Sequence, residues 1–452
     1  MITTKTPIVS LQAPKDVSIE EIEAELRSLW SSAGGDEESS VSRAATFSLI
    51  VYEPNSTQLL LSALGFYSGP VDGISGPRSH TAIEAAQKAY GMEVTGEASD
   101  ELLERLQTEF TKAKEADKLT TENKTAAIKY SPDSQSTIAD AIASSNPCRI
   151  ITLVPNLGQD EGVTAQVSAY CPVNKKNKES LICCEYITLS GTAKALERIG
   201  GVITGLTIGE LPKFVWWKAS PSPEHDLFKR LTSYCDSVIF DSSGFIDPES
   251  SLSALAQMSQ QGEVLADLNW RRLASWQELS AEAFDPPERR ADIYKVDRVT
   301  IDYEKGNTAQ ALMYLGWLAS RLNWNPTGYE HEGGDYDIRK IHFSNSEGKA
   351  IEAELAAIPT ADWGEIPGDL VSLRLSSTNL KADCCTVLCS STTGCMRMEA
   401  GGGAQSCYVQ QVAPLFDQKT EDLLAQQLQR WGREVLYEES MAVTVKIIEL
   451  AQ

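Results

Sequence analysis

Apolar runs of strand length alternate with helix-length segments over residues 148–322, and this alternation constrains the fold more than any other feature of the sequence. Parallel strands need helical crossover connections, so the pattern predicts an α/β domain with a mainly parallel sheet. Strand-like runs occur at 148–154, 162–170, 182–188, 202–206, 215–217, 237–240 and 298–303. Helix-like segments lie between them at 192–200, 224–235, 250–260, 271–283 and 307–322.

The flanking segments have different patterns. A helix is expected over residues 18–30, because Ser18 and Glu21 have the spacing of a capping box. A short run of apolar and β-branched residues at 44–52 predicts a buried strand. Beyond residue 325, several strands follow in series before two helical runs. That order predicts a C-terminal α+β region with a more antiparallel sheet.

The sharpest local pattern lies between residues 58 and 106. An apolar helix ends at Gly65, a residue typical of a left-handed helix C-terminus. The turn at 69–73 follows, in which glycines are free to adopt positive φ. Two further helices complete a pattern that resembles the peptidoglycan-binding-like three-helix domain, with Ala86 where that family usually has an aromatic residue. The resemblance implies either a glycan-binding module or a helical module reused for contacts between proteins.

This module interrupts the α/β pattern at a loop, where insertions are tolerated. Removing residues 54 to 134 joins the first strand to a helix at 136–145 and to the next strand, which restores a strand–helix–strand unit. We therefore expect a Rossmann-like α/β body with an inserted three-helix domain and a C-terminal α+β region. The expected parts are 1–53 (N-terminal helix and first strand), 54–110 (helical insert), 111–134 (linker), 135–325 (α/β body) and 326–452 (C-terminal region).

Composition narrows the classes of function. The 452 residues suggest about three domains, and 63 acidic against 40 basic residues give a formal charge of −23. Such a chain is not expected to bind nucleic acid or an anionic membrane, because both require a basic surface. We find neither a signal peptide nor a membrane-spanning run, and the ten cysteines are dispersed, which is typical of reduced proteins. The sequence predicts a cytoplasmic protein.

Motifs of catalysis are missing from the sequence. It contains no GxGxxG, P-loop, HExxH or GxSxG pattern, and its four histidines lack the spacing of metal ligands. Residues 241–244 (DSSG) follow a strand, and we expect a capped loop there in preference to a nucleophile turn. We therefore expect a non-enzymatic protein without a cofactor or metal. An enzyme acting on a sugar phosphate stays an alternative, for which the sequence offers no residues.

Three phrases outside the insert point to one family. They are NPCRIITLV at 146–154, LPKFVWWK at 211–218 and DLNWRRLASW at 267–276. Together they resemble the glucose-6-phosphate dehydrogenase assembly protein (OpcA) family over most of the chain, and the insert is similar to that of members from photosynthetic bacteria. The resemblance implies a partner that binds oligomeric glucose-6-phosphate dehydrogenase, activates it and so controls entry to the oxidative pentose phosphate pathway. The alternative is a peptidoglycan- or glycan-binding protein, or the binding subunit of a cell-wall enzyme.

Five residues of these phrases are candidates for contact with the dehydrogenase: Trp216, Trp217, Trp270, Arg271 and Trp276. Tryptophan is enriched at the centres of protein interfaces. Adjacent residues of a strand point to opposite faces of the sheet, so we expect one of Trp216 and Trp217 in the core and the other at the surface or in a groove. Packing within the core is the alternative for all five.

Members of the family in photosynthetic bacteria are linked to control by thioredoxin, which makes the cysteines relevant. Residues 382–389 have the pattern of a strand, 390–394 that of a loop and 395–398 that of a returning strand. In this hairpin Cys389 and Cys395 are expected directly opposite each other, with Cα atoms about 4.5 Å apart. A strained, exposed disulfide at such a pair is readily reduced by thioredoxin-like proteins.

Other cysteines leave the pairing open. Cys385 and Cys407 are alternative partners for the expected disulfide. Cys183 and Cys184 are adjacent in a strand, and we expect them to pack. Buried thiols that never oxidise are the alternative reading of all these residues.

Overall fold

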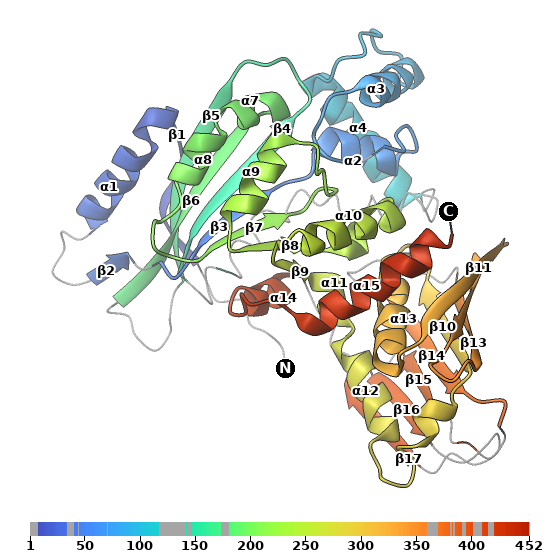
Figure 1. Ribbon diagram of the computed structural model, residues 1–452. Coiled ribbons are helices and arrows are strands. Elements are labelled where there is room, and N and C mark those ends of the chain that lie inside the picture. Colours follow the sequence, from blue (N-terminus) through green and yellow to red (C-terminus); the bar gives the residue numbers. More distant parts are fainter. Residues whose placement is uncertain are drawn as a thin grey trace.

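The computed structural model contains two β-sheets with helices packed around them (Figure 1). The structure describes residues 8–33, 40–43, 45–69, 71–116, 142, 147–172, 180–358, 369–379, 382, 385–390, 395–400, 409–414 and 420–451. Within these residues the first sheet has nine strands and the second has eight. No helix in the described part of the chain is long and apolar enough to cross a membrane.

Six strands of the first sheet run parallel, in the spatial order β6-β4-β3-β7-β8-β9. They are β3 (Ser48–Tyr52), β4 (Arg149–Asn156), β6 (Ser180–Thr192), β7 (Lys213–Trp217), β8 (Ser237–Phe240) and β9 (Leu265–Asp267). Counted along the chain this is 3-2-1-4-5-6, the strand order of dinucleotide-binding doubly wound folds, which reverses direction between β3 and β7. The expected Rossmann-like body is thus confirmed.

Three further strands extend the β6 side of this sheet. β1 (Ile8–Val17) pairs antiparallel with β5 (Val163–Pro172), β5 pairs antiparallel with β6, and β2 (Ser40–Arg43) pairs parallel with β6. The capping box predicted at Ser18 and Glu21 is present, and it starts the short helix η1 (Ile19–Glu21) that leads into α1 (Ile22–Ala33).

Helices cover the parallel strands, so that every residue of β3 is buried. They are α7 (Ala193–Arg198), α8 (Gly200–Gly205), α9 (Asp226–Tyr234), α10 (Pro248–Gln260), α11 (Leu268–Arg272) and the single turn η2 (Ser242–Gly244). α12 (Ala274–Phe284) follows α11 in the chain and packs on the second sheet. The expected strand at 202–206 is wrong, because these residues belong mainly to α8. One helical turn buries Ile203 fully while Val202 stays 40% exposed, and a short β-branched run does not distinguish this arrangement from a strand.

The second sheet has the order β11-β12-β13-β10-β14-β15-β16-β17, in which only the pair β10 and β13 is parallel. The strands are β10 (Arg298–Glu304), β11 (Asn325–Gly333), β12 (Ile338–Ser344), β13 (Ala350–Ile358), β14 (Leu370–Ser376), β15 (Cys385–Ser390), β16 (Cys395–Ala400) and β17 (Val409–Pro414). The expected antiparallel C-terminal sheet is confirmed. β10 pairs within it, however, so the second unit begins before the expected boundary at residue 326.

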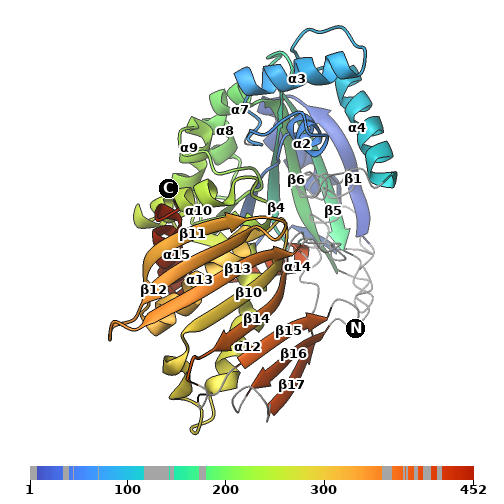
Figure 2. The same ribbon diagram turned by 90° about the vertical axis from the view of Figure 1, so that its right-hand side faces the viewer.

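Helices lie on one face of the second sheet, which Figure 2 shows from its open side. They include α12, α13 (Thr308–Leu322) and α15 (Val435–Glu449). Two shorter helices lie between these in the chain: η3 (Asp292–Lys295) before β10 and α13, and α14 (Thr420–Gln427) before α15. Side chains of these helices share one continuous apolar core with the first sheet, which includes Trp217 and Tyr314. The two units are therefore packed against each other through a common core.

The insert forms a three-helix module at one end of the first sheet (Figure 1). Its helices are α2 (Ser56–Ala63), α3 (Pro77–Ala89) and α4 (Asp100–Glu115), which pack around Leu60, Ile83 and Leu106. This confirms the predicted three helices, and Gly65 has the expected positive φ of 82° after α2. α4 continues beyond the expected end of the insert at residue 110. The rest of the expected linker lies outside the described residues, as does the helix at 136–145 except for the buried Ile142.

Candidate functional site

The strand order of the first sheet reverses between β3 and β7, and this point is where doubly wound folds bind their ligands, beyond the carboxyl ends of the strands. Tyr52 and Trp217 are the last residues of these two strands and lie opposite each other in the register. Their rings stack with centroids 3.8 Å apart and an interplanar angle of 7°. Both side chains are fully buried, so an aromatic pair fills the centre of the site.

A turn of the inserted module covers this pair. The Tyr52 hydroxyl donates a hydrogen bond of 2.9 Å to the backbone oxygen of Asp72, and the Ser220 N–H donates one of 3.3 Å to the oxygen of Val71. Gly73 has a φ of +78°, and a Cβ atom there would lie 2.6 Å from the Pro155 Cβ atom and 3.0 Å from the Tyr52 hydroxyl. The turn therefore lies directly against the end of the sheet.

Buried amides hold the turn in place. The Gln58 side chain accepts a hydrogen bond of 2.8 Å from the Gly73 N–H and donates one of 3.1 Å to the Ile74 oxygen. Asn55 caps α2 and donates a hydrogen bond of 2.9 Å to the oxygen of Pro155, which is near the end of β4. Burial raises the pKa of the Asp72 carboxyl in this turn. The module is thus attached to the sheet through backbone and amide groups.

An ion pair closes the site beside the aromatic pair. Glu53 and Lys218 directly follow β3 and β7, and the lysine Nζ lies 2.5 Å from a Glu53 carboxylate oxygen. The same ammonium group lies 4.9 Å from the ring centroid of Trp216. In dinucleotide-binding folds the residues after the first strand form a glycine-rich turn, whose N–H groups approach a pyrophosphate. Here a carboxylate and a proline occupy that segment.

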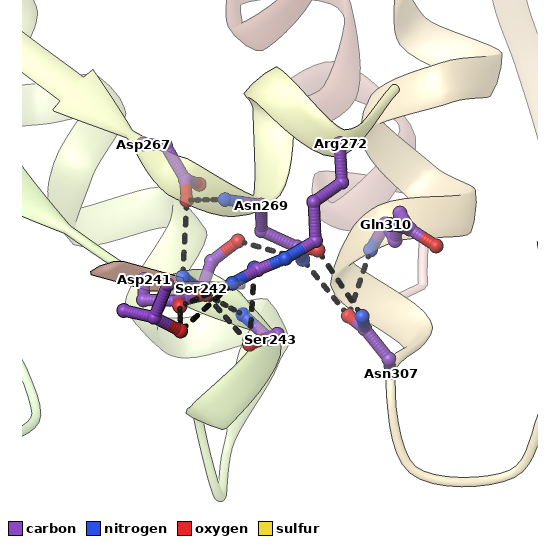
Figure 3. A network of polar contacts seen from close by, with 9 residues as sticks. Asp241, Ser242, Ser243, Asp267, Asn269, Arg272, Asn307 and Gln310 are labelled. Atoms are coloured by element: carbon purple, nitrogen blue, oxygen red, sulfur yellow. Dashed lines mark hydrogen bonds and ion pairs between the residues drawn. The ribbon is translucent and has the colours of Figure 1, made fainter. Parts of the chain in front are cut away.

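A second polar cluster joins the first sheet to the second unit (Figure 3). Asp241, directly after β8, forms a two-pronged ion pair with Arg272 of α11 at 2.7 and 2.8 Å. Burial opposes ionisation of Asp241, but Arg272 outweighs it and holds the carboxyl pKa at about 2. Arg272 also donates a hydrogen bond of 3.1 Å to the Thr420 hydroxyl at the start of α14. The capped loop expected at 241–244 is confirmed, since the Asp241 side chain accepts from the Ser243 N–H.

The cluster continues through amide side chains into the second unit. Asp267 accepts hydrogen bonds from the Ser242 and Asn269 N–H groups at 3.0 and 2.9 Å, and burial raises its pKa to about 6. Asn269 donates a hydrogen bond of 2.9 Å to Asn307, the cap of α13. The Gln310 side chain on α13 accepts a hydrogen bond of 3.0 Å from the N–H of Leu370, the first residue of β14. This chain of contacts fixes the two units relative to each other.

The candidate tryptophans are all buried: Trp216, Trp217, Trp270 and Trp276 are between 1% and 3% exposed. Trp216 and Trp217 do point to opposite faces of the sheet, since they belong to different apolar clusters. The expectation that one of them reaches the surface is wrong, because both faces of this parallel sheet are covered. Trp270 donates a hydrogen bond of 2.8 Å to Glu434, and Arg271 is half-buried.

The hairpin expected around the cysteines is present as β15 and β16, with a different register. Cys389 lies opposite Met396, and Cys395 lies opposite Ser390. The expectation that the two cysteines face each other directly is therefore wrong by one residue. Cys385 is buried in the large apolar core. Cys407 and the loop at 391–394 lie outside the described residues.

Sequence reasoning did not single out Tyr52, Gln58 and Arg272. Tyr52 could have been noticed from its position, because it ends an apolar strand-like run. Arg272 gave no comparable signal, since β9 before it is only three residues long. Gln58 gave no such signal, since its role depends on the fold of the turn at Gly73.

The fold and the site define a class of protein: a Rossmann-like body whose ligand position is filled by its own side chains and by an inserted helical module. Residues 139–257 match the family described as glucose-6-phosphate dehydrogenase subunit N-terminal domain, and residues 263–441 match the corresponding C-terminal domain. Residues 56–106 match the family described as putative peptidoglycan binding domain.

Two relatives match over the full chain. The putative OxPP cycle protein OpcA of Synechocystis sp. is 58% identical, covering 100% of this chain and 96% of that protein. The protein of the same name from Nostoc punctiforme is 57% identical, covering 100% and 97%. The chain belongs to the OpcA family of glucose-6-phosphate dehydrogenase-associated proteins. Among solved structures, KijD10, a 3-ketoreductase from Actinomadura kijaniata, aligns with 58% of this chain and 81% of its own at 9% identity, with a TM-score of 0.37 that carries no functional argument.

Proposed function

We propose that this chain is a non-catalytic partner that binds oligomeric glucose-6-phosphate dehydrogenase and activates it. The matches to the two subunit families and to OpcA proteins along the whole chain support the choice of partner. The observation that carries the non-catalytic part is the stacked pair of Tyr52 and Trp217 under the turn at Gly73, which fills the place where this fold would hold a ligand.

Activation sets a thermodynamic requirement. A partner shifts the equilibrium between two states of an enzyme only if it binds one state more tightly than the other. A tenfold decrease in the apparent half-saturation corresponds to about 1.4 kcal/mol of such coupling. The contribution of this chain is then a preformed surface, which the contacts between its units and its insert keep rigid. We also propose that the protein acts in the cytoplasm.

The test is a titration of the dehydrogenase with glucose 6-phosphate, with and without saturating amounts of this chain. We expect a lower half-saturation, a higher turnover, or both. An unrelated acidic protein at the same concentration is the control, because a net charge of −23 alone can affect an enzyme through general electrostatics. If neither parameter of the dehydrogenase changes, the proposed function is wrong.

Redox control through thioredoxin is the finer part of the proposal. The same titration is made with protein incubated with a disulfide oxidant and with protein reduced by thioredoxin. An effect on half-saturation only after reduction supports a redox gate in this chain. Alanine variants of Cys389 and Cys395, separately and together, then determine whether those two residues carry it. Equal activation of the dehydrogenase in all redox states would show that redox control is wrong, while the activator role would still stand.

The match of residues 56–106 to a peptidoglycan-binding family favours a second candidate function, in cell-wall glycan binding. We propose instead that the module serves contacts within the protein, because its turn at Gly73 is buried against the sheet. A pull-down on purified peptidoglycan distinguishes the two. Retention of the full chain that a soluble glycan competes away would favour the glycan-binding candidate.

A further inference from the structure

Two cysteines lie side by side on neighbouring parallel strands: Cys148 directly before β4 and Cys184 within β6. Cys148 directly precedes Arg149, which pairs with Glu185 in the register of β4 and β6, and Cys184 directly precedes Glu185. The Glu185 N–H donates a hydrogen bond of 3.2 Å to the Cys148 oxygen, so the ladder continues to this pair. Neighbouring strands are about 4.8 Å apart, which is within the Cα separation of about 4.4–6.8 Å that a disulfide spans.

The two sulfur atoms also interact. The Cys148 N–H donates a hydrogen bond of 3.4 Å to the Cys184 Sγ atom. Burial, followed by a side-chain hydrogen bond with Cys184, raises the pKa of Cys148. The same hydrogen bond lowers the pKa of Cys184, although burial opposes this. One thiol therefore supports the other as the thiolate, which is the reactive form in disulfide exchange.

We propose that Cys148 and Cys184 form a reversible disulfide between β4 and β6. The oxidant is a low-molecular-weight or protein disulfide. The Cys184 thiolate attacks one sulfur of that disulfide, which breaks its S–S bond and releases the first thiol. Cys148 then loses its proton and attacks the Cys184 sulfur, which forms the new S–S bond and releases the second thiol. Two protons and two electrons pass from the cysteines to the oxidant.

Both cysteines are buried, within one apolar cluster of the first sheet. A disulfide oxidant reaches them only when the structure around them opens locally. Oxidation is therefore expected to be slow in the folded chain.

The experiment uses the full chain equilibrated in glutathione buffers from fully reducing to fully oxidising. Thiols are alkylated under denaturing conditions, and peptides are mapped by mass spectrometry. We expect a Cys148–Cys184 linked peptide that forms in oxidised glutathione and disappears on reduction. Cys148→Ala and Cys184→Ala each abolish it, whereas Cys235→Ala, at a cysteine on another element, leaves it unchanged. Mapping of the unaltered chain gives the answer even if a variant fails to fold.

Full alkylation of both cysteines in oxidised glutathione would overturn the proposal, as would linkage of either residue to a different cysteine.

Discussion

Replacing Gly73 with alanine tests whether the turn of the insert seals the end of the first sheet. The substitution adds one methyl group at a residue with a φ of +78°, against Pro155 and the Tyr52 hydroxyl. The left-handed conformation costs a residue with a Cβ atom about 1–2 kcal/mol. Forcing a methyl group into a packed site adds about 1–3 kcal/mol. The total expected loss is about 2–5 kcal/mol.

Gly91 provides the matched control. Its φ of +68° is similar, and no atom lies within 4 Å of the position of a Cβ atom there. Gly91→Ala is therefore expected to cost only the conformational part, about 1–2 kcal/mol. The two variants differ in whether the new methyl group meets the sheet, so the difference between them measures the contact of the turn with Pro155 and Tyr52.

Urea denaturation and amide hydrogen exchange are the assays. Gly73→Ala is expected to lower the protection of α2–α4 and of the backbone around Tyr52 more than Gly91→Ala does. Measuring exchange by segment matters, because the module can open without unfolding of the rest of the chain. An equal loss of stability in the two variants would refute the reasoning, since the contact would then contribute nothing beyond backbone conformation.

Three further predictions concern the buried groups. Arg272→Ala leaves the Asp241 carboxylate buried without its charge partner and is expected to cost about 3–5 kcal/mol in chemical denaturation; a loss below about 1 kcal/mol would contradict this. The folded-state pKa of Asp267 is about 6, above its usual value of about 3.9, so its ionisation destabilises the fold as the pH rises through that window. Asp267→Asn is therefore expected to raise the free energy of unfolding by up to about 3 kcal/mol above pH 6 and to have little effect near pH 4. A stability difference between the two proteins that does not change with pH would show that the pKa of Asp267 is not raised. Trp217→Ala is expected to lower the free energy of unfolding by about 3–5 kcal/mol and to reduce activation of the dehydrogenase only because less of the chain is folded. Loss of activation at an unchanged melting temperature would contradict this and would indicate that Trp217 contacts the dehydrogenase.

The parallel strands were predictable because strands with both faces buried contain nearly continuous apolar runs, as in residues 48–52. β9 is only three residues long, and β1 contains a proline and two charged residues, so neither gives such a run. The same rule explains the error at Trp216 and Trp217. Alternation along a strand separates two faces, but only the tertiary packing decides whether a face is exposed.

The site could be predicted only in part, because its residues come from distant parts of the chain. The sequence identified the turn at 69–73, but the sheet that it packs against becomes visible only once β3, β4 and β7 are side by side. The register at Cys389 has a related cause. The sequence of a hairpin loop does not fix the pairing of its two strands to the residue, and a shift of one residue separates two cysteines that would otherwise be opposite.

The position of the insert also affects how the chain folds. Thr46 and Pro147 are hydrogen-bonded neighbours at the start of β3 and β4, although 101 residues separate them in sequence. Closing a loop of that length is entropically costly, and contacts between distant residues slow folding. The three helices of the insert have mainly local contacts and can form first. If they form first, they shorten the loop between the two strands and lower the entropic cost of pairing β3 with β4.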